Sequence, residues 1–132
     1  MTYVKINGIS LDVDVAISSI EETFNVLDGE NTGRVKSGRM VRDIIGTYIG
    51  HKVTFFNGKS NEEFDRLWDY LVEHSVDDSV QLEAADGQSS IAYEAYYTTG
   101  TRRLSDGSVN DGVNKWDELE VSFVPMDAQV KP

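Results

Sequence analysis

The chain has 132 residues, a formal net charge of −11 and no cysteine. This length suits one domain with a real hydrophobic core, and the lack of cysteine excludes a disulfide framework or a cysteine-based metal site. The charge argues against nucleic-acid binding through phosphate contacts and against adsorption to anionic membranes. The opening residues do not resemble a secretion signal, and no apolar stretch is long enough to span a membrane. We therefore expect a single domain over residues 1–132 that is made in a cytoplasm.

The first part of the chain predicts β-strands. Apolar residues alternate on both sides of Asn7-Gly8, the dipeptide most typical of a two-residue hairpin turn. The alternation then changes parity, because Ile17 is at an odd position whereas Phe24 and Val26 are at even ones. This switch predicts a β-bulge or a break near Ser18-Ser19.

A basic segment follows. Residues 28–39 combine a turn cluster, DGENTG, with the polar run RVKSGR, which predicts a flexible loop. From Arg34 to Lys52 the chain carries five cations and one acid. On an otherwise acidic body this stretch is suited to docking on a second copy, although a solvated loop is an equally simple interpretation. The predicted self-assembly residues are Arg34, Lys36, Arg39, Arg42, Asp28 and Glu30.

The pattern of residues 40–56 is ambiguous. Val41, Ile44, Ile45 and Tyr48 have helical spacing, but the stretch is rich in β-branched and aromatic residues and contains Gly46 and Gly50. We interpret it as one long or two short strands, and whether residues 40–50 are strand or helix stays open.

The clearest helical signal is Ser60–Ser75, where apolar residues recur at i, i+3, i+4 and i+7 behind a capping box of Ser60 and Glu63. Three strands follow, within residues 80–84, 91–98 and 119–123, and the tail 126–132 is expected to be loosely held. The predicted fold is mainly β, a β-sandwich or barrel, with one packed helix. The predicted core residues are Phe64, Leu67, Trp68, Leu71, Leu119, Val121 and Phe123.

No motif indicates catalysis, a cofactor or a metal. Residues 106–117 have some of the spacing of a calcium loop, but Asp111 stands where an EF-hand requires glycine. His51 and His74 have no neighbour at ligand spacing. Glu118 and Glu120 fit the solvent face of a half-buried strand, and a glycosidase-type carboxylate pair is a distant alternative because its separation is a three-dimensional property.

The phrases YVKINGISLDV, GRMVRDIIGTYIGHKVTFF and KWDELEVSFVP, and their layout over about residues 3–125, resemble small tail structural proteins of phages and prophages of Gram-positive bacteria. Such proteins commonly belong to the tail-tube-like superfamily. The resemblance implies a β-sandwich or barrel with one helix, no catalytic residues, and a place in the virion tail after synthesis in the host cytoplasm. It also implies rings, with the hexamer as a candidate, formed with itself and other tail proteins around an acidic channel for unbound DNA.

Whether such a ring is a tail tube, a tube terminator, a distal tail or a baseplate adaptor is open at this point. The alternative function is a monomeric β-sandwich module that binds a sugar or a peptide through Tyr93–Tyr97 and Trp116. The two predictions differ in the surface that would carry the function. A ring protein associates with itself, whereas a sugar module presents aromatic rings in one plane.

Overall fold

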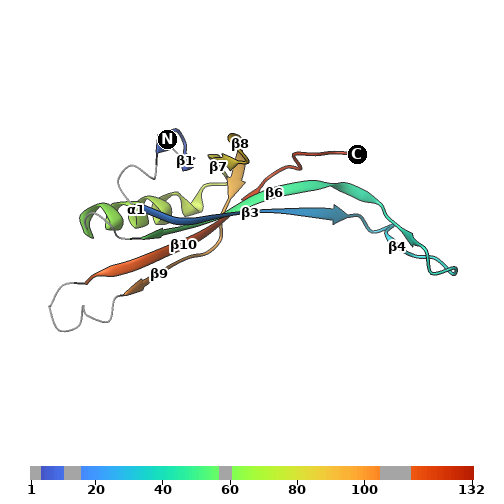
Figure 1. Ribbon diagram of the computed structural model, residues 1–132, viewed down its shortest axis with the longest axis horizontal. Helices are drawn as coiled ribbons and strands as arrows, with labels where there is room; N and C mark the ends of the chain where they lie inside the picture. Colours follow the sequence, from blue (N-terminus) through green and yellow to red (C-terminus); the bar gives the residue numbers. More distant parts are fainter. Residues whose placement is uncertain (1–3, 11–15, 57–60, 105–113) are drawn as a thin grey trace.

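The computed structural model describes residues 4–10, 16–56, 61–104 and 114–132. Strands make up most of this part of the chain, and the one α-helix lies between β6 and β7 in the sequence (Figure 1). In chain order the elements are β1 (Val4–Ile6), β2 (Ile9–Ser10), β3 (Ala16–Asp28), β4 (Gly33–Arg34), β5 (Met40–Val41), β6 (Ile44–Phe56), α1 (Asn61–Glu73), the 3-10 turn η1 (His74–Val76), β7 (Val80–Asp86), β8 (Ser89–Tyr96), β9 (Gly100–Leu104) and β10 (Trp116–Pro125).

The main sheet is open. Its order is β2-β1-β7-β8-β10-β6-β3, with β9 attached to β10, while β4 and β5 form a separate pair. Strand β10 joins the two halves, because residues 118–123 pair with β6 and Val124 and Pro125 pair with β8. The prediction of a mainly β fold with one helix is confirmed, but the strands do not close into a barrel.

Local sequence signals explain the first turns. Asn7 and Gly8 have φ values of 51° and 83°, the left-handed pair that a tight two-residue hairpin needs, and Ile6 faces Ile9 across the turn. The bulge is also confirmed. Ile17 pairs with Phe55 and Ser19 with the next residue of β6, so β3 contains one extra residue between them.

Residues 40–41 and 44–56 are strand, which settles the ambiguity of their pattern in favour of strands. One glycine in this stretch has a packing role. A Cβ atom at Gly46 would lie 2.6 Å from the Cβ of Ala128 and 2.9 Å from the carbonyl oxygen of Val130. Glycine at this position therefore lets the C-terminal tail cross β6 at close range.

Part of that tail is anchored, contrary to our expectation of a loose end. The Thr47 amide donates to the Val130 carbonyl at 2.8 Å. The Gln129 side chain accepts from the Ile49 amide at 2.9 Å and donates to the Ile49 carbonyl at 3.0 Å. The pairing of β10 with β6 ends at His51. The bonds to the tail lie on the same edge of β6, beyond that point.

The predicted helix is present as α1, and Ser60 of its capping box lies outside the described residues. Its stripe of Phe64, Leu67 and Leu71 is buried in the core, together with apolar side chains from both halves of the sheet. Of the predicted core residues only Trp68 is half-buried, at the margin of this cluster. The described part of the chain contains no helix with the length and apolar character needed to cross a bilayer.

Candidate assembly surface

The most prominent feature of the molecule is a long β-arm. Strands β3 and β6 pair continuously to Asp28 and Ile44, whereas the pairing of β10 with β6 stops at His51. Beyond that point the hairpin of residues 23–50 projects from the body, as Figure 1 shows. We call residues 23–50 the arm and residues 29–43 its tip.

The loop predicted over residues 28–39 contains part of a short strand pair at the tip. Gly33 pairs with Val41 and Arg34 with Met40, and the Val35 amide donates to the Arg39 carbonyl at 3.0 Å. The sequence RVKSGR gave no strand signal because it lacks alternating apolar residues. Gly38, with φ of 87°, supplies the left-handed residue on which this turn depends.

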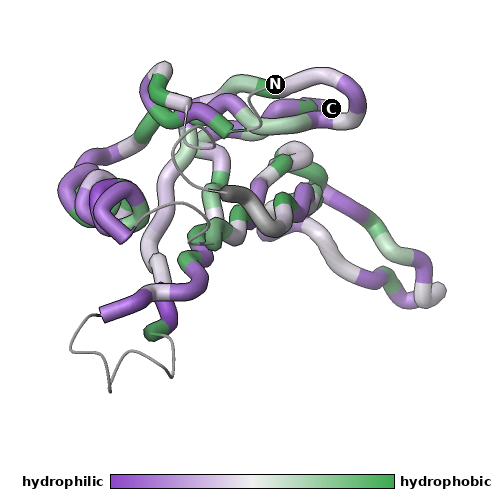
Figure 2. Tube along the Cα trace, turned by 60° about the vertical axis from the view of Figure 1, so that its left-hand side comes forward, coloured by the Kyte–Doolittle hydropathy of each residue, from purple (hydrophilic) through white to green (hydrophobic). Residues whose placement is uncertain are grey.

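The arm exposes an unusual amount of apolar surface. Phe24 is 70% exposed and Ile45 is 49% exposed. Within the described residues, half of the large hydrophobic side chains that reach solvent lie between positions 24 and 45: Phe24, Val26, Leu27, Val35, Met40, Val41, Ile44 and Ile45. Figure 2 shows hydrophobic segments alternating with hydrophilic ones along this projection. A concentration of exposed apolar side chains of this kind is typical of interaction sites.

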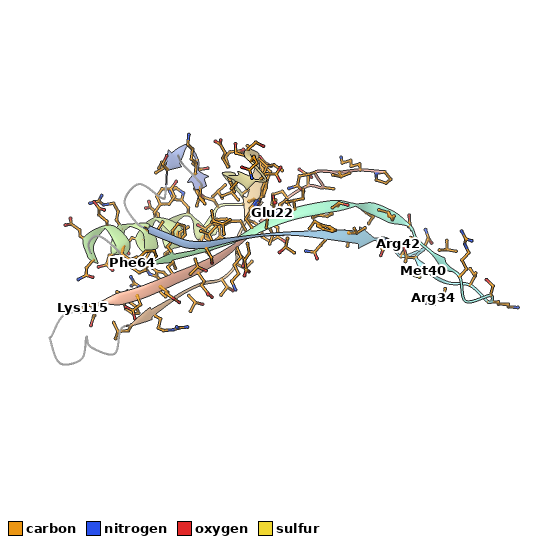
Figure 3. The ribbon with its side chains drawn as sticks, viewed as in Figure 1. Glu22, Arg34, Met40, Arg42, Phe64 and Lys115 are labelled. Carbon is orange, nitrogen blue, oxygen red and sulfur yellow. The ribbon has the colours of Figure 1, made fainter. Side chains whose placement is uncertain are left out.

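The predicted self-assembly residues all lie on this arm, but they behave differently. Arg42 donates a bidentate pair of hydrogen bonds to the Asp28 carboxylate of the same chain, with distances of 3.1 and 3.2 Å. That pair fastens the base of the tip. Arg34, Lys36 and Arg39 are exposed, and in the described part of the chain none of the three takes part in an ion pair. Glu30 is exposed beside them, and Figure 3 shows Arg34, Met40 and Arg42 along the tip.

A buried polar cluster lies where the arm meets the body, and the sequence did not suggest it. The His51 side chain on β6 is fully buried. Its Nδ1 is 2.6 Å from the Tyr93 hydroxyl, and its Nε2 is 3.0 Å from the Ala85 carbonyl and 3.3 Å from a Glu22 carboxylate oxygen. A neutral ring with its proton on Nε2 satisfies every contact, since Nε2 then donates to Ala85 and Glu22 while Tyr93 donates to Nδ1.

The same cluster contains two acids. Glu22 on β3 has Asp86 on β7 as a neighbour, and partial burial together with this carboxyl raises the pKa of Glu22 above its ordinary range, although His51 opposes the shift. Burial also raises the pKa of Tyr93. The cluster therefore ties β3, β6, β7 and β8 together.

The other sequence candidates have structural roles. His74 contacts Asp77 at 2.8 Å at the end of the helix. Glu118 and Glu120 lie on the solvent side of β10, near Arg103 and Lys52 respectively. Among the described residues no group of histidines and acids has the arrangement of a metal site. Residues 106–113 of the calcium-like segment lie outside the described residues.

The aromatic residues proposed for a sugar site do not form an open platform. The Tyr97 hydroxyl donates to the Leu71 carbonyl at 2.6 Å, and Tyr93 is bound to His51. Trp116 is covered by the Arg102 guanidinium, which lies 4.2 Å from its ring centroid and 4.5 Å from that of Trp68. Arg102 is held there by Asp65 at 3.1 Å. These contacts disfavour the sugar-binding alternative.

No protein-family model matches the chain, and no curated protein sequence matches it significantly. Solved structures share its fold. The Dit protein of phage SPP1, described as a paradigm of the hub adsorption apparatus in phages that infect Gram-positive bacteria, gives a TM-score of 0.56 at 15% identity over 95% of this chain and 49% of Dit. A chain from the virion of a native gene transfer agent particle gives 0.55 at 10% identity, over 85% of this chain and 81% of that one. The chain thus spans about half the length of SPP1 Dit, and its fold is one found in phage hub and virion proteins.

Proposed function

We propose that the chain is a non-enzymatic structural subunit of a phage tail, a tube, distal tail or baseplate adaptor protein that assembles into rings. Its partners are copies of itself, with a hexamer as the candidate stoichiometry, and other tail proteins. It is made in the host cytoplasm and ends in the virion tail. The observation that carries this proposal is the arm, which exposes eight large hydrophobic side chains and three cations, Arg34, Lys36 and Arg39, that form no ion pair within the described fold.

The fold supports the same function. The structures that share it belong to a phage hub and to a virion. A monomer that left Phe24, Ile45 and the tip residues in water would carry a permanent apolar patch, whereas a ring covers such a patch at each subunit boundary. Rings are built from heterologous contacts, in which one surface of a subunit meets a different surface of the next.

The net charge of −11 supports an acidic channel through which DNA passes without binding. The proposal predicts that a duplex DNA fragment shows no mobility shift with the assembled protein, even at low salt, where phosphate contacts are strongest. Retention of the fragment at low salt would contradict the role of DNA as unbound cargo.

Sedimentation velocity over a concentration and salt series tests assembly directly. We expect the wild-type chain to associate as concentration rises. Arg39→Glu combined with Arg42→Glu is expected to weaken this association while the far-ultraviolet circular dichroism stays unchanged, because both positions lie on the exposed tip. Purified protein that stays monomeric at every concentration would contradict self-assembly.

A matched control separates tip geometry from tip charge. Arg42→Glu also removes the ion pair with Asp28, so the same assay is run on Asp28→Arg combined with Arg42→Glu, which exchanges the partners and keeps the net charge of the arm. Normal association of this exchange variant would assign the loss in the first variant to charge. Loss in both would assign it to the geometry of this pair.

A further inference from the structure

The outer surface of α1 combines acidic and apolar residues. Val72 is 52% exposed and Val76 is 87% exposed. Asp69 lies three residues before Val72 and four before Glu73, so these side chains are neighbours on the helix. In the described part of the chain no ion pair involves Asp69, Glu73 or Asp78. We call these five residues the helix surface.

A groove runs beside the helix surface. It has a volume of ≈ 100 Å³ and is lined by Trp68, Leu71, Val72, Ser75 and Tyr97, with Gly100 and β10 at its floor. A water molecule occupies about 30 Å³ in the liquid, so this space suits one apolar side chain of moderate size. The site therefore offers an apolar recess bordered by carboxylates.

The tip of the arm has the opposite character. Val35 is 49% exposed, Met40 41% and Val41 46%. The cations Arg34, Lys36 and Arg39 surround them, and the Arg34 guanidinium is held toward the tip by a 2.9 Å hydrogen bond to the Gly38 carbonyl. We call these six residues the tip surface. Both surfaces are thus partly apolar, and their charges are opposite.

The two surfaces cannot meet within one chain. In Figure 1 the helix and the tip lie at opposite ends of the longest axis of the molecule, and Figure 3 shows Phe64 of α1 and Arg34 of the tip at the two ends. A contact between them therefore joins two copies head to tail. Contacts of this heterologous type close into rings when the rotation between copies permits it and otherwise form open arrays.

We propose that the tip surface of one copy docks on the helix surface of the next, with Met40 or a neighbouring valine in the groove beside Trp68 and the tip cations against Asp69 and Glu73. This inference rests on the proposed self-assembly and specifies its contact. It names the partner as a second copy of this chain because charge and apolar exposure match across the two surfaces. A basic tip alone would have suggested any acidic partner.

Site-specific cross-linking tests the contact, and the chain suits it because it has no cysteine. One variant carries Met40→Cys, and a second variant, with a tag that changes its mass, carries Val72→Cys. The two are mixed in equal amounts at concentrations where the wild type associates and are oxidised mildly. We expect a mixed disulfide dimer on non-reducing gels, several-fold above that from a control pair of Met40→Cys and Ala92→Cys. Ala92 is exposed on β8, away from α1.

The outcomes separate this inference from the proposed function. A mixed dimer above the control supports docking. Association of the wild type without a mixed dimer overturns the docking model and leaves ring assembly standing. A wild type that stays monomeric, together with cysteine variants that yield no mixed dimer, overturns both.

Charge reversal gives a second, independent readout. Arg34→Glu with Arg39→Glu inverts the tip, and Asp69→Lys with Glu73→Lys inverts the helix surface. Each variant alone is expected to lose association, whereas an equal mixture recovers it because every tip then meets a helix surface of opposite sign. Two variants that each fail to associate and also fail as a mixture would overturn the pairing of these surfaces.

Discussion

Truncation of one helix residue tests whether α1 holds the fold together. Leu67 is 7% exposed and lies between Phe64 and Leu71 in the buried stripe. Leu67→Ala removes three carbon atoms from this environment, worth about 2 kcal/mol in lost burial at ~0.8 kcal/mol each. The cavity left behind raises the cost, and Leu→Ala changes in cores span about 2–5 kcal/mol. We expect a loss of about 3 kcal/mol in the free energy of unfolding.

Urea unfolding, followed by the fluorescence of Trp68 and Trp116, measures this loss. With a denaturant slope of about 1–3 kcal/mol per molar urea, the midpoint should fall by about 1–3 M. Val72→Ala is the matched control, because Val72 lies one residue after Leu71 but is 52% exposed. Its expected cost is below about 1 kcal/mol, and the better helix propensity of alanine reduces it by a few tenths.

The comparison of the two variants decides the interpretation. If Leu67→Ala costs no more than Val72→Ala, the helix is peripheral and the core forms without it. The measurements belong at low protein concentration, because Val72 is part of the proposed helix surface and self-association would add stability by mass action.

Three further changes probe other parts of the molecule. The raised pKa of Glu22 implies stability that is present at acid pH and lost as pH rises through that pKa; Glu22→Gln should flatten this fall in a series of urea unfolding curves that runs from acid to neutral pH, and an unchanged pH profile would refute the assignment. Arg102→Ala should cost about 1–2 kcal/mol by removing cation–π contacts and should shift tryptophan fluorescence; identical spectra and stability would show that the stack contributes nothing. Phe24→Ser should weaken association in sedimentation velocity without lowering the urea midpoint, since Phe24 is 70% exposed; a lower midpoint would place Phe24 in the monomer core.

Local patterns in the sequence predicted the elements well. The hairpin at Asn7-Gly8, the bulge near Ser18-Ser19 and the helix are each encoded by neighbours along the chain, in turn chemistry, parity and spacing. The length of the arm is not encoded in this way. It depends on where β10 stops pairing with β6, which is a property of residues more than sixty positions apart.

The candidate site was predicted only in part. The residues predicted for self-assembly all lie on the arm, but composition could not show that Arg42 is paired with Asp28 while Arg34 and Arg39 form no ion pair in the described part of the chain. The buried cluster was missed because His51 looked isolated. A signal was present, since His51 alternates with the buried Val53 and Phe55 and so shares their inward face. Its partners on β3, β7 and β8 required the sheet topology.

The C-terminal tail covers one edge of the arm and leaves the other edge unpaired. Gln129 and Val130 occupy the outer edge of β6, whereas β3 is the last strand of the sheet and its far edge has no strand beside it in the described part of the chain. A long unpaired edge next to exposed apolar side chains is a template for uncontrolled strand addition. Under the proposed function, subunits that have not yet joined a ring would therefore be open to strand addition along β3 and protected from it along β6. The tail therefore blocks strand addition along β6 but not along β3. Early covering of the β3 edge by a neighbouring subunit would keep the protein from aggregating.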